Sequence, residues 1–289
     1  MTYEVELAYE YNAELGEGPI WDDIREELLW LDVTRGKILF FSPSRGVQNE
    51  IQLDRHIGSL ALTRNLDLCL ALRDGFAHYS FQSQSITSFT QVIESDEVRF
   101  NDGAVDRQGR FLAGTMGYNP KPNTGNLYTF TEDSGYRLLI PEVGVSNGIC
   151  WNGDSSQMYF IDSMTQSIQV FDYNLYWGSA ANPKVLIKFD SQLGIPDGMT
   201  IDEEGSLWVA MWDGSQILKI SSDGDIVDAI KFPVSRVTSL TFGGTDLRDL
   251  YVTSARYELS FEELAHQPLA GSLFKVRARV PGISENRMN

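Results

Sequence analysis

One short pattern recurs six times along the chain, and its spacing limits the folds that the chain can adopt. Each copy has a site position, three further residues, an apolar residue and usually a small polar residue. The site positions, which are 41, 43, 46, 50 and 41 residues apart, are Glu17, Gly58, Asn101, Asn147, Asp197 and Thr238. A fixed period in this range is typical of repeat architectures. If the copies are arranged around an axis, side chains at the site position point toward a common centre.

Further strand-like segments follow each copy. A nearly continuous apolar run comes about five to seven residues after the small polar residue, as at residues 28–31 and 158–161. Strands that are covered on both faces have such sequences. Gly, Asn and Asp often separate the two segments, and these residues favour tight turns. A third, partly alternating segment follows, as at residues 37–41. Five copies have a weaker fourth one, as at residues 228–232.

Six units of four antiparallel strands predict an all-β fold, a six-bladed β-propeller. The sixth copy lacks a fourth segment, and a spare strand stands at residues 3–9. We therefore expect this N-terminal strand to supply the outer strand of the last blade. A β-sandwich also has strands at turn-bounded spacing, but it gives no reason for six copies in one phase. The prediction is a single domain over residues 1–289, with one short helix near residues 260–265.

Charge limits the partners of the chain. Its 289 residues carry a net charge of −17, and the resulting field repels nucleic acid and anionic membrane surfaces. No segment approaches the roughly 18 consecutive apolar residues of a membrane span, and no secretory signal is visible. We expect a cytoplasmic protein, a monomer or weak homo-oligomer, that acts on a small molecule and binds neither nucleic acid nor membrane.

Cysteine and histidine residues give no sign of a nucleophile or a metal cluster. Cys69 and Cys150 lie in apolar, strand-like runs, which predicts buried thiols and no disulfide framework. The three histidines, His56, His78 and His266, show no metal-ligand spacing, and we interpret them as structural.

At the site positions, the side-chain oxygen atoms of Glu17, Asn147 and Asp197 suit a cation. Asn147-Gly148 and Asp197-Gly198 are also ordinary turn dipeptides, and Glu17 alone would fit a solvated loop. Their shared phase at the start of an inner strand favours convergence instead. Two carboxylates at one mouth repel each other unless a positive charge lies between them. The pattern predicts one divalent cation, Ca²⁺, Mg²⁺, Mn²⁺, Zn²⁺ or Fe²⁺, with open positions for water and substrate.

Short stretches of distinctive sequence, among them LGEGP and RFNDG, occur in order over essentially the whole chain. They lie at residues 15–19, 99–103, 111–116, 145–148, 159–163, 195–199, 207–210, 242–244, 250–256 and 267–271. On these stretches the chain resembles the senescence-marker-protein (regucalcin), gluconolactonase and luciferin-regenerating enzyme family. The resemblance implies a six-bladed propeller with one divalent cation in its central channel. It places the metal ligands of the family on Glu17, Asn147 and Asp197, and its substrate-contacting residues on Arg99 and Asn101.

One loop departs from the family pattern. After Gly-Thr-Met, animal members carry an acidic residue that touches the sugar. In this chain, Tyr118 or Asn119 stands there, within the loop 117–125. We expect these two residues to bind the substrate and to decide which sugar fits, while the reaction type stays that of the family.

The resemblance implies a metal-dependent hydrolase that opens a sugar lactone, such as gluconolactone or a pentonolactone, to the aldonic acid. Asp197 would be the general base that activates water, Arg99 would contact the lactone or its product, and Asn101 would bind a sugar hydroxyl or a water molecule. Asp102 is a turn residue or a rival base. Two alternatives remain: hydrolysis of another ester or an organophosphate at the same cation, and a non-catalytic calcium-binding or scaffold propeller.

Overall fold

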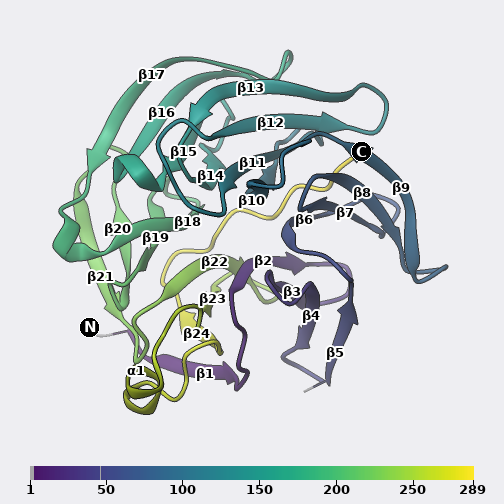
Figure 1. The fold of residues 1–289 in the computed structure, drawn as a ribbon. Helices are drawn as coiled ribbons and strands as arrows, with labels where there is room; N and C mark the ends of the chain where they lie inside the picture. The colour runs from purple at the N-terminus through teal and green to yellow at the C-terminus, as the bar shows by residue number, and fades with distance from the viewer. Residues whose placement is uncertain (1–2, 46) are drawn as a thin grey trace. The chain divides into compact units, whose positions relative to one another are not determined.

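The computed structural model describes residues 3–45 and 47–289, in which nearly all the regular secondary structure is β-strand. Six four-stranded antiparallel sheets are the blades of a six-bladed β-propeller, so the predicted fold class is confirmed (Figure 1). The chain divides into two compact units, Met1–Asp54 with Phe189–Ser284 and Arg55–Lys188 with Glu285–Asn289. The single domain expected over residues 1–289 stays a prediction.

The first unit contains three sheets, which we name blades one, five and six after their order in the chain. Blade one consists of β2 (Gly16–Asp22), β3 (Glu27–Asp32), β4 (Lys37–Ser42) and β5 (Val47–Gln52). Blade five consists of β18 (Ile195–Ile201), β19 (Leu207–Trp212), β20 (Gln216–Ile220) and β21 (Ile226–Lys231). Blade six consists of β22 (Val237–Gly243), β23 (Asp249–Ser254), β24 (Leu273–Arg277) and β1 (Val5–Tyr9).

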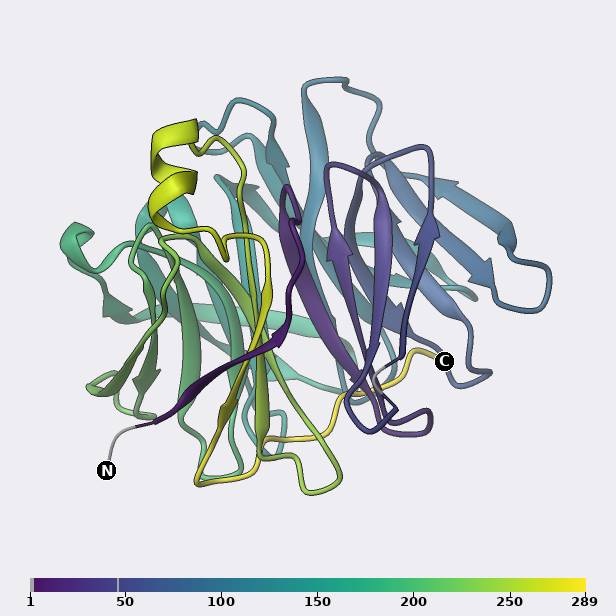
Figure 2. The ribbon, with the colours of Figure 1, turned by 90° about the horizontal axis from the view of Figure 1, so that it is seen from below.

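The N-terminal strand completes blade six as predicted. β1 pairs with β24 in antiparallel register, with Val5 opposite Val276 (Figure 2). The predicted short helix is also present as α1 (Phe261–His266), between β23 and β24. A capping box begins it, because the side chains of Ser260 and Glu263 each bond the backbone of the other. No described helix is long and apolar enough to cross a membrane.

The second unit contains blades two, three and four. Blade two consists of β6 (Ile57–Leu62), β7 (Leu68–Leu72), β8 (Gly75–Ser80) and β9 (Ser85–Gln91). Blade three consists of β10 (Val98–Val105), β11 (Phe111–Gly117), β12 (Gly125–Thr131) and β13 (Gly135–Val143). Blade four consists of β14 (Ser146–Trp151), β15 (Gln157–Asp162), β16 (Ser167–Asn174) and β17 (Ser179–Lys188). Two single 3-10 turns complete the elements, η1 (Ser163–Thr165) in this unit and η2 (Ser191–Leu193) in the first.

Large side chains fill the space between neighbouring blades within each unit. Trp208 packs edge-on against Phe242 between blades five and six, with ring centroids 5.9 Å apart. Phe76 stacks on Phe130 between blades two and three, at 4.4 Å. This packing of side chains between blades explains the apolar second strands, since each has a neighbouring blade over its face. Cys69 and Cys150 are both buried free thiols, which confirms the prediction of buried thiols.

Each inner strand carries a β-bulge at the site position of the repeat. The pairing register shifts between residues 17 and 20, 57 and 59, 100 and 103, 147 and 149, 196 and 199, and 237 and 240. A bulge re-aims the side chain that it carries and often lies beside a functional site. Asn147-Gly148 and Asp197-Gly198 therefore lie inside strands, and the alternative that they form hairpin turns is wrong.

Candidate functional site

Two of the predicted metal ligands, Glu17 and Asp197, belong to the first unit. They lie on β2 and β18, and both of these inner strands pack against β22. The Thr238 hydroxyl on β22 donates to the carbonyl of the residue before Glu17, at 2.6 Å. On its other side, β22 approaches Gly198 so closely that an added Cβ atom would lie 2.2 Å from Ser239 Oγ. The two carboxylates thus flank one strand, with Asp197 only 6% exposed.

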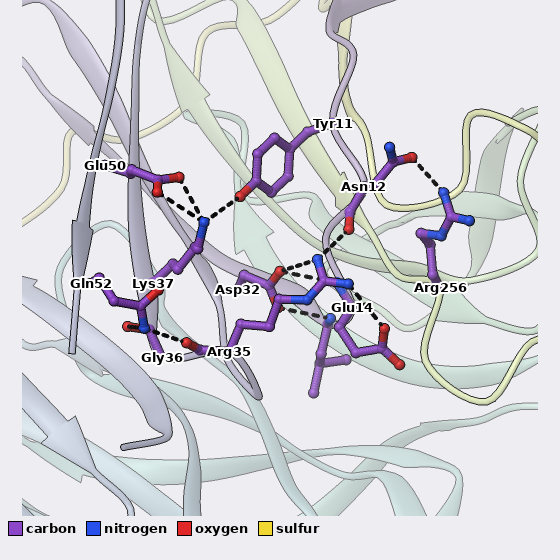
Figure 3. A network of polar contacts seen from close by, with 11 residues as sticks. Tyr11, Asn12, Glu14, Asp32, Arg35, Gly36, Lys37, Glu50, Gln52 and Arg256 are labelled. Carbon is purple, nitrogen blue, oxygen red and sulfur yellow. Dashed lines mark hydrogen bonds and ion pairs between the residues drawn. The ribbon is translucent and has the colours of Figure 1, made fainter. Parts of the chain in front are cut away.

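A buried acid fixes the backbone that leads into Glu17. Asp32, at the end of β3, accepts hydrogen bonds from the backbone N–H groups of Glu14 (3.1 Å) and Leu15 (3.3 Å) (Figure 3). Arg35 donates to Asp32 at 3.1 Å and also reaches the Glu14 carboxylate at 3.4 Å. The segment before β2 is therefore held by the neighbouring strand, and this positions the first bulge and its carboxylate.

In the second unit, hydrogen bonds join Arg99, Asn101 and Asn147 in series. Arg99 Nη1 donates to Asn101 Oδ1 at 2.8 Å, and Asn101 Nδ2 donates to Asn147 Oδ1 at 2.9 Å. Asn147 Nδ2 in turn donates to Ser163 Oγ at 2.8 Å. Arg99 and Asn147 are 7% and 5% exposed, so the series is largely buried. Two predicted substrate-binding residues and one predicted metal ligand are contiguous, as the repeat phase suggested for Asn101 and Asn147.

A second buried acid, Asp162, holds the start of β14 and so positions Asn147. Its carboxylate accepts the backbone N–H groups of Gly144 (2.9 Å), Val145 (3.0 Å) and Met164 (3.1 Å). Sequence reasoning missed both Asp162 and Asp32. The repeat contains the signal that could have found them, because each directly follows the apolar run of the second strand in its blade.

The two loop residues predicted to bind substrate differ in their surroundings. The Tyr118 hydroxyl lies 3.0 Å from Nδ1 of His56, and the centre of its ring lies 6.0 Å from the guanidinium carbon of Arg99. Asn119 is exposed, and the side-chain hydrogen bonds of the described residues include none from it. The structure thus brings Tyr118 beside Arg99. From the sequence, His56 is interpreted as structural because the histidines show no metal-ligand spacing, and this contact with Tyr118 was not predicted.

Asp102, the rival base, lies on β10 directly after Asn101. Its Oδ1 accepts the backbone N–H of Gly103 at 2.7 Å. Burial raises the pKa of Asp102 to about 6; the Gly103 N–H acts in the opposite direction, and the negative charge of Glu285 adds to the rise. A carboxyl group with this pKa exchanges protons near neutral pH, which suits general acid–base chemistry.

The chemistry of the predicted donor set fits a hard divalent cation. Glu17 and Asp197 offer carboxylate oxygens, and Asn147 Oδ1 has a second lone pair beyond the one that accepts from Asn101. Among residues 3–45 and 47–289, no three His, Cys, Asp or Glu side chains lie together as a metal cluster. The predicted set has two carboxylates and an amide, divided between the two units, and it stays a prediction.

The chain is similar to known proteins over nearly its whole length. Residues 15–256 match the family model described as the SMP-30/Gluconolactonase/LRE-like region. Regucalcin of Gallus gallus is 37% identical over 95% of this chain and 94% of its own. A Bacillus subtilis protein, YvrE, named provisionally as a sugar lactone lactonase, is 33% identical over 96% and 95%. The crystal structure of an Agrobacterium tumefaciens regucalcin, described as a calcium-binding protein, shares the fold with a TM-score of 0.96, at 23% identity over 100% of this chain and 98% of its own.

Proposed function

Because the chain belongs to the SMP-30/gluconolactonase/LRE-like family, we propose that it is a metal-dependent lactonase that opens a sugar lactone to the aldonic acid. The provisional lactonase name of the Bacillus relative supports this reaction class. The observation that carries the proposal is the buried series from Arg99 through Asn101 to Asn147. This series joins Arg99 and Asn101, which can bond the lactone carbonyl and sugar hydroxyls, directly to Asn147, whose side-chain oxygen can bind a cation.

The proposed cation is divalent and is held by Glu17, Asn147 and Asp197. Ca²⁺, Zn²⁺, Mn²⁺, Mg²⁺ and Fe²⁺ all accept oxygen ligands of this kind. When bound, such a cation supplies Lewis acidity toward the lactone carbonyl. The calcium-binding description of the Agrobacterium regucalcin supports a divalent cation here.

Side chains of the protein handle the proton and orient the substrate. Asp197 takes a proton from the attacking water and returns it to the ring oxygen as the ring opens. Arg99, a permanent cation, donates hydrogen bonds to the lactone and then to the carboxylate of the product. Asn101 Oδ1 has a second lone pair beyond the one that accepts from Arg99, so it accepts a hydrogen bond from a sugar hydroxyl. Asp102 is the alternative base, and its raised pKa supports that role.

Two other functions would use the same residues. One is hydrolysis of another ester or an organophosphate at the cation, and the other is a non-catalytic calcium-binding or scaffold role. A scaffold has no need for an arginine that is 7% exposed and bonded to Asn101 beside the ligand amide. This observation favours turnover over a scaffold.

Acid release from a panel of substrates tests the proposal. The metal-loaded protein is given five- and six-carbon aldonolactones, a simple aryl ester and an organophosphate triester, and the rate is followed in a pH-stat. We expect aldonolactones to be hydrolysed with the highest kcat/KM. Preference for the aryl ester or the triester would move the proposal to that substrate class, and no turnover of any of them would support a scaffold.

A further inference from the structure

Tyr118, His56 and Arg99 come from three separate stretches of the second unit and meet in space. The phenol oxygen of Tyr118 is 3.0 Å from Nδ1 of His56, and the two ring centroids are 5.7 Å apart. The Tyr118 ring also lies 6.0 Å from the guanidinium carbon of Arg99, at the outer limit of a cation–π contact. Arg99 is 7% exposed and Tyr118 is 43% exposed. These contacts therefore connect the buried guanidinium of Arg99, in the proposed substrate site, to the partly exposed ring of Tyr118.

Backbone hydrogen bonds hold all three residues in place. The N–H of Tyr118 donates to the carbonyl of Glu97 at 2.9 Å, which ties the start of the loop to the segment that precedes Arg99. The N–H of Arg73 donates to the carbonyl of His56 at 3.0 Å, and the carbonyl of Arg73 accepts from the residue after Arg99, also at 3.0 Å. His56 is thus connected through one residue to the strand that carries Arg99.

The charges around this group favour a neutral imidazole. Burial lowers the pKa of His56, and the positive charges of Arg99 and Arg73 lower it further. Around the phenol of Tyr118, burial raises the pKa, the same two arginines lower it, and Asp74 and Asp96 act weakly in the raising direction. A neutral imidazole has one donor and one acceptor nitrogen. The His56–Tyr118 contact is therefore a single directional hydrogen bond between uncharged groups.

We infer that His56 is a positioning residue that holds the Tyr118 ring beside Arg99, and that this ring is a wall that sorts lactones by the size of the group on the lactone ring. The inference rests on the proposed lactonase function. A ring tied at its hydroxyl presents a fixed, apolar face. A compact lactone places C–H bonds against such a face. The longer hydroxylated side chain of a six-carbon lactone needs polar partners that the face lacks, so it is disfavoured while the ring is held.

A double-mutant cycle isolates the hydrogen bond. His56→Phe keeps a ring but loses the nitrogen, Tyr118→Phe keeps the ring but loses the hydroxyl, and the third variant carries both changes. The ratio of kcat/KM for a six-carbon lactone to that for a five-carbon lactone is measured in each metal-loaded protein. We expect each single variant to raise this ratio roughly three- to tenfold, the effect of one neutral hydrogen bond. The double variant should go no further, because both changes remove the same bond. The change should lie mainly in KM, since the wall does not touch the reacting carbonyl.

The matched control is His78→Phe, on β8 of blade two, the blade whose first strand directly follows His56. His78 bonds Thr87 Oγ1 at 2.8 Å on the β8–β9 pair and has no part in the proposed site. It should leave the substrate ratio unchanged. A ratio unaffected by His56→Phe, or effects of the two single variants that simply add, would overturn the inference while leaving the lactonase proposal intact.

The NMR signal of Tyr118 tests the positioning role of His56 independently of the proposed lactonase activity. The protein contains 12 tyrosines, and with ¹³Cζ-tyrosine labelling the resonance of Tyr118 is identified by its loss in Tyr118→Phe. If the wild-type protein opens no lactone, the proposed function fails. In that case a shifted Tyr118 resonance in His56→Phe, absent from His78→Phe, still supports the positioning role. An unshifted resonance overturns it.

Discussion

At the scale of single residues, the proposed hydrolysis depends on which carboxylate moves the proton. Asp197 is buried on a bulged inner strand, and Asp102 has a pKa raised to about 6 beside Asn101. Asp197 is also a proposed metal ligand, so removing its whole side chain would confuse binding with chemistry. Substitutions by asparagine keep an oxygen and remove only the charge.

Asp197→Asn should lower kcat at least about 100-fold while part of the metal affinity remains, because it loses the base but keeps an oxygen donor. Steady-state kinetics and calorimetric metal titration measure the two effects separately. Full activity in this variant would show that the base lies elsewhere, and Asp102 would then be the first candidate.

Asp102→Asn should change how stability depends on pH. The fold raises the pKa of Asp102 from 3.8 to about 6, so the folded protein binds this proton more tightly than the unfolded chain does. The wild-type protein should therefore lose stability from this group as pH rises from about 4 to about 6. The asparagine variant, which has no charge to bury, should gain up to about 3 kcal/mol relative to wild type over that interval. Urea unfolding of metal-free proteins at several pH values measures the difference. Parallel pH profiles would contradict the assignment.

At the scale of the strand, the site depends on how each inner strand begins. The buried carboxylates of Asp32 and Asp162 bond the backbone just before β2 and β14. The sequence predicted the strands and the shared phase of Glu17, Asn147 and Asp197, because a repeat shows both. It could not predict the bulges, since a bulge is a shift in pairing between two strands. Nor could it place His56 beside Tyr118, which depends on backbone contacts between segments far apart in the chain.

Asp162→Asn should destabilise the protein by about 2 kcal/mol, because an amide places an N–H₂ group among the backbone donors that the carboxylate accepts. Denaturant unfolding gives the loss. The exposed Asp172, on β16, is the control, and Asp172→Asn should stay within about 0.5 kcal/mol of wild type. Equal effects of the two substitutions would show that Asp162 does not anchor the start of β14.

At the scale of the whole molecule, both ends of the described chain bond to strands or turns that lie far from them in the sequence. β1 supplies the outer strand of blade six. Near the other end, the backbone N–H groups of Glu203 and Gly282 donate to Pro281 and Leu247 within the first unit. Met288 then bonds Leu62 and Arg64 in the second unit. One short segment therefore contributes to the stability of each unit in turn.

Met288→Ala should lower the free energy of unfolding by about 2–4 kcal/mol, because Met288 is fully buried in the core between blades two and three. Replacing the exposed Ser284 by alanine should have almost no effect. Thermal and urea unfolding compare the two variants. If Met288→Ala is as stable as the Ser284 variant, the segment does not hold the second unit as described.

We propose that lactone opening requires one divalent cation, held by Glu17, Asn147 and Asp197. The most direct measurement is the rate of acid release from an aldonolactone as chelated protein is titrated with Ca²⁺, Zn²⁺ or Mn²⁺, for the wild type and for Glu17→Gln. We expect no enzymatic rate without cation, full activity near one cation per chain, and a large loss of both cation affinity and rate in Glu17→Gln. Undiminished hydrolysis by the metal-free wild-type protein would contradict the proposed cation requirement.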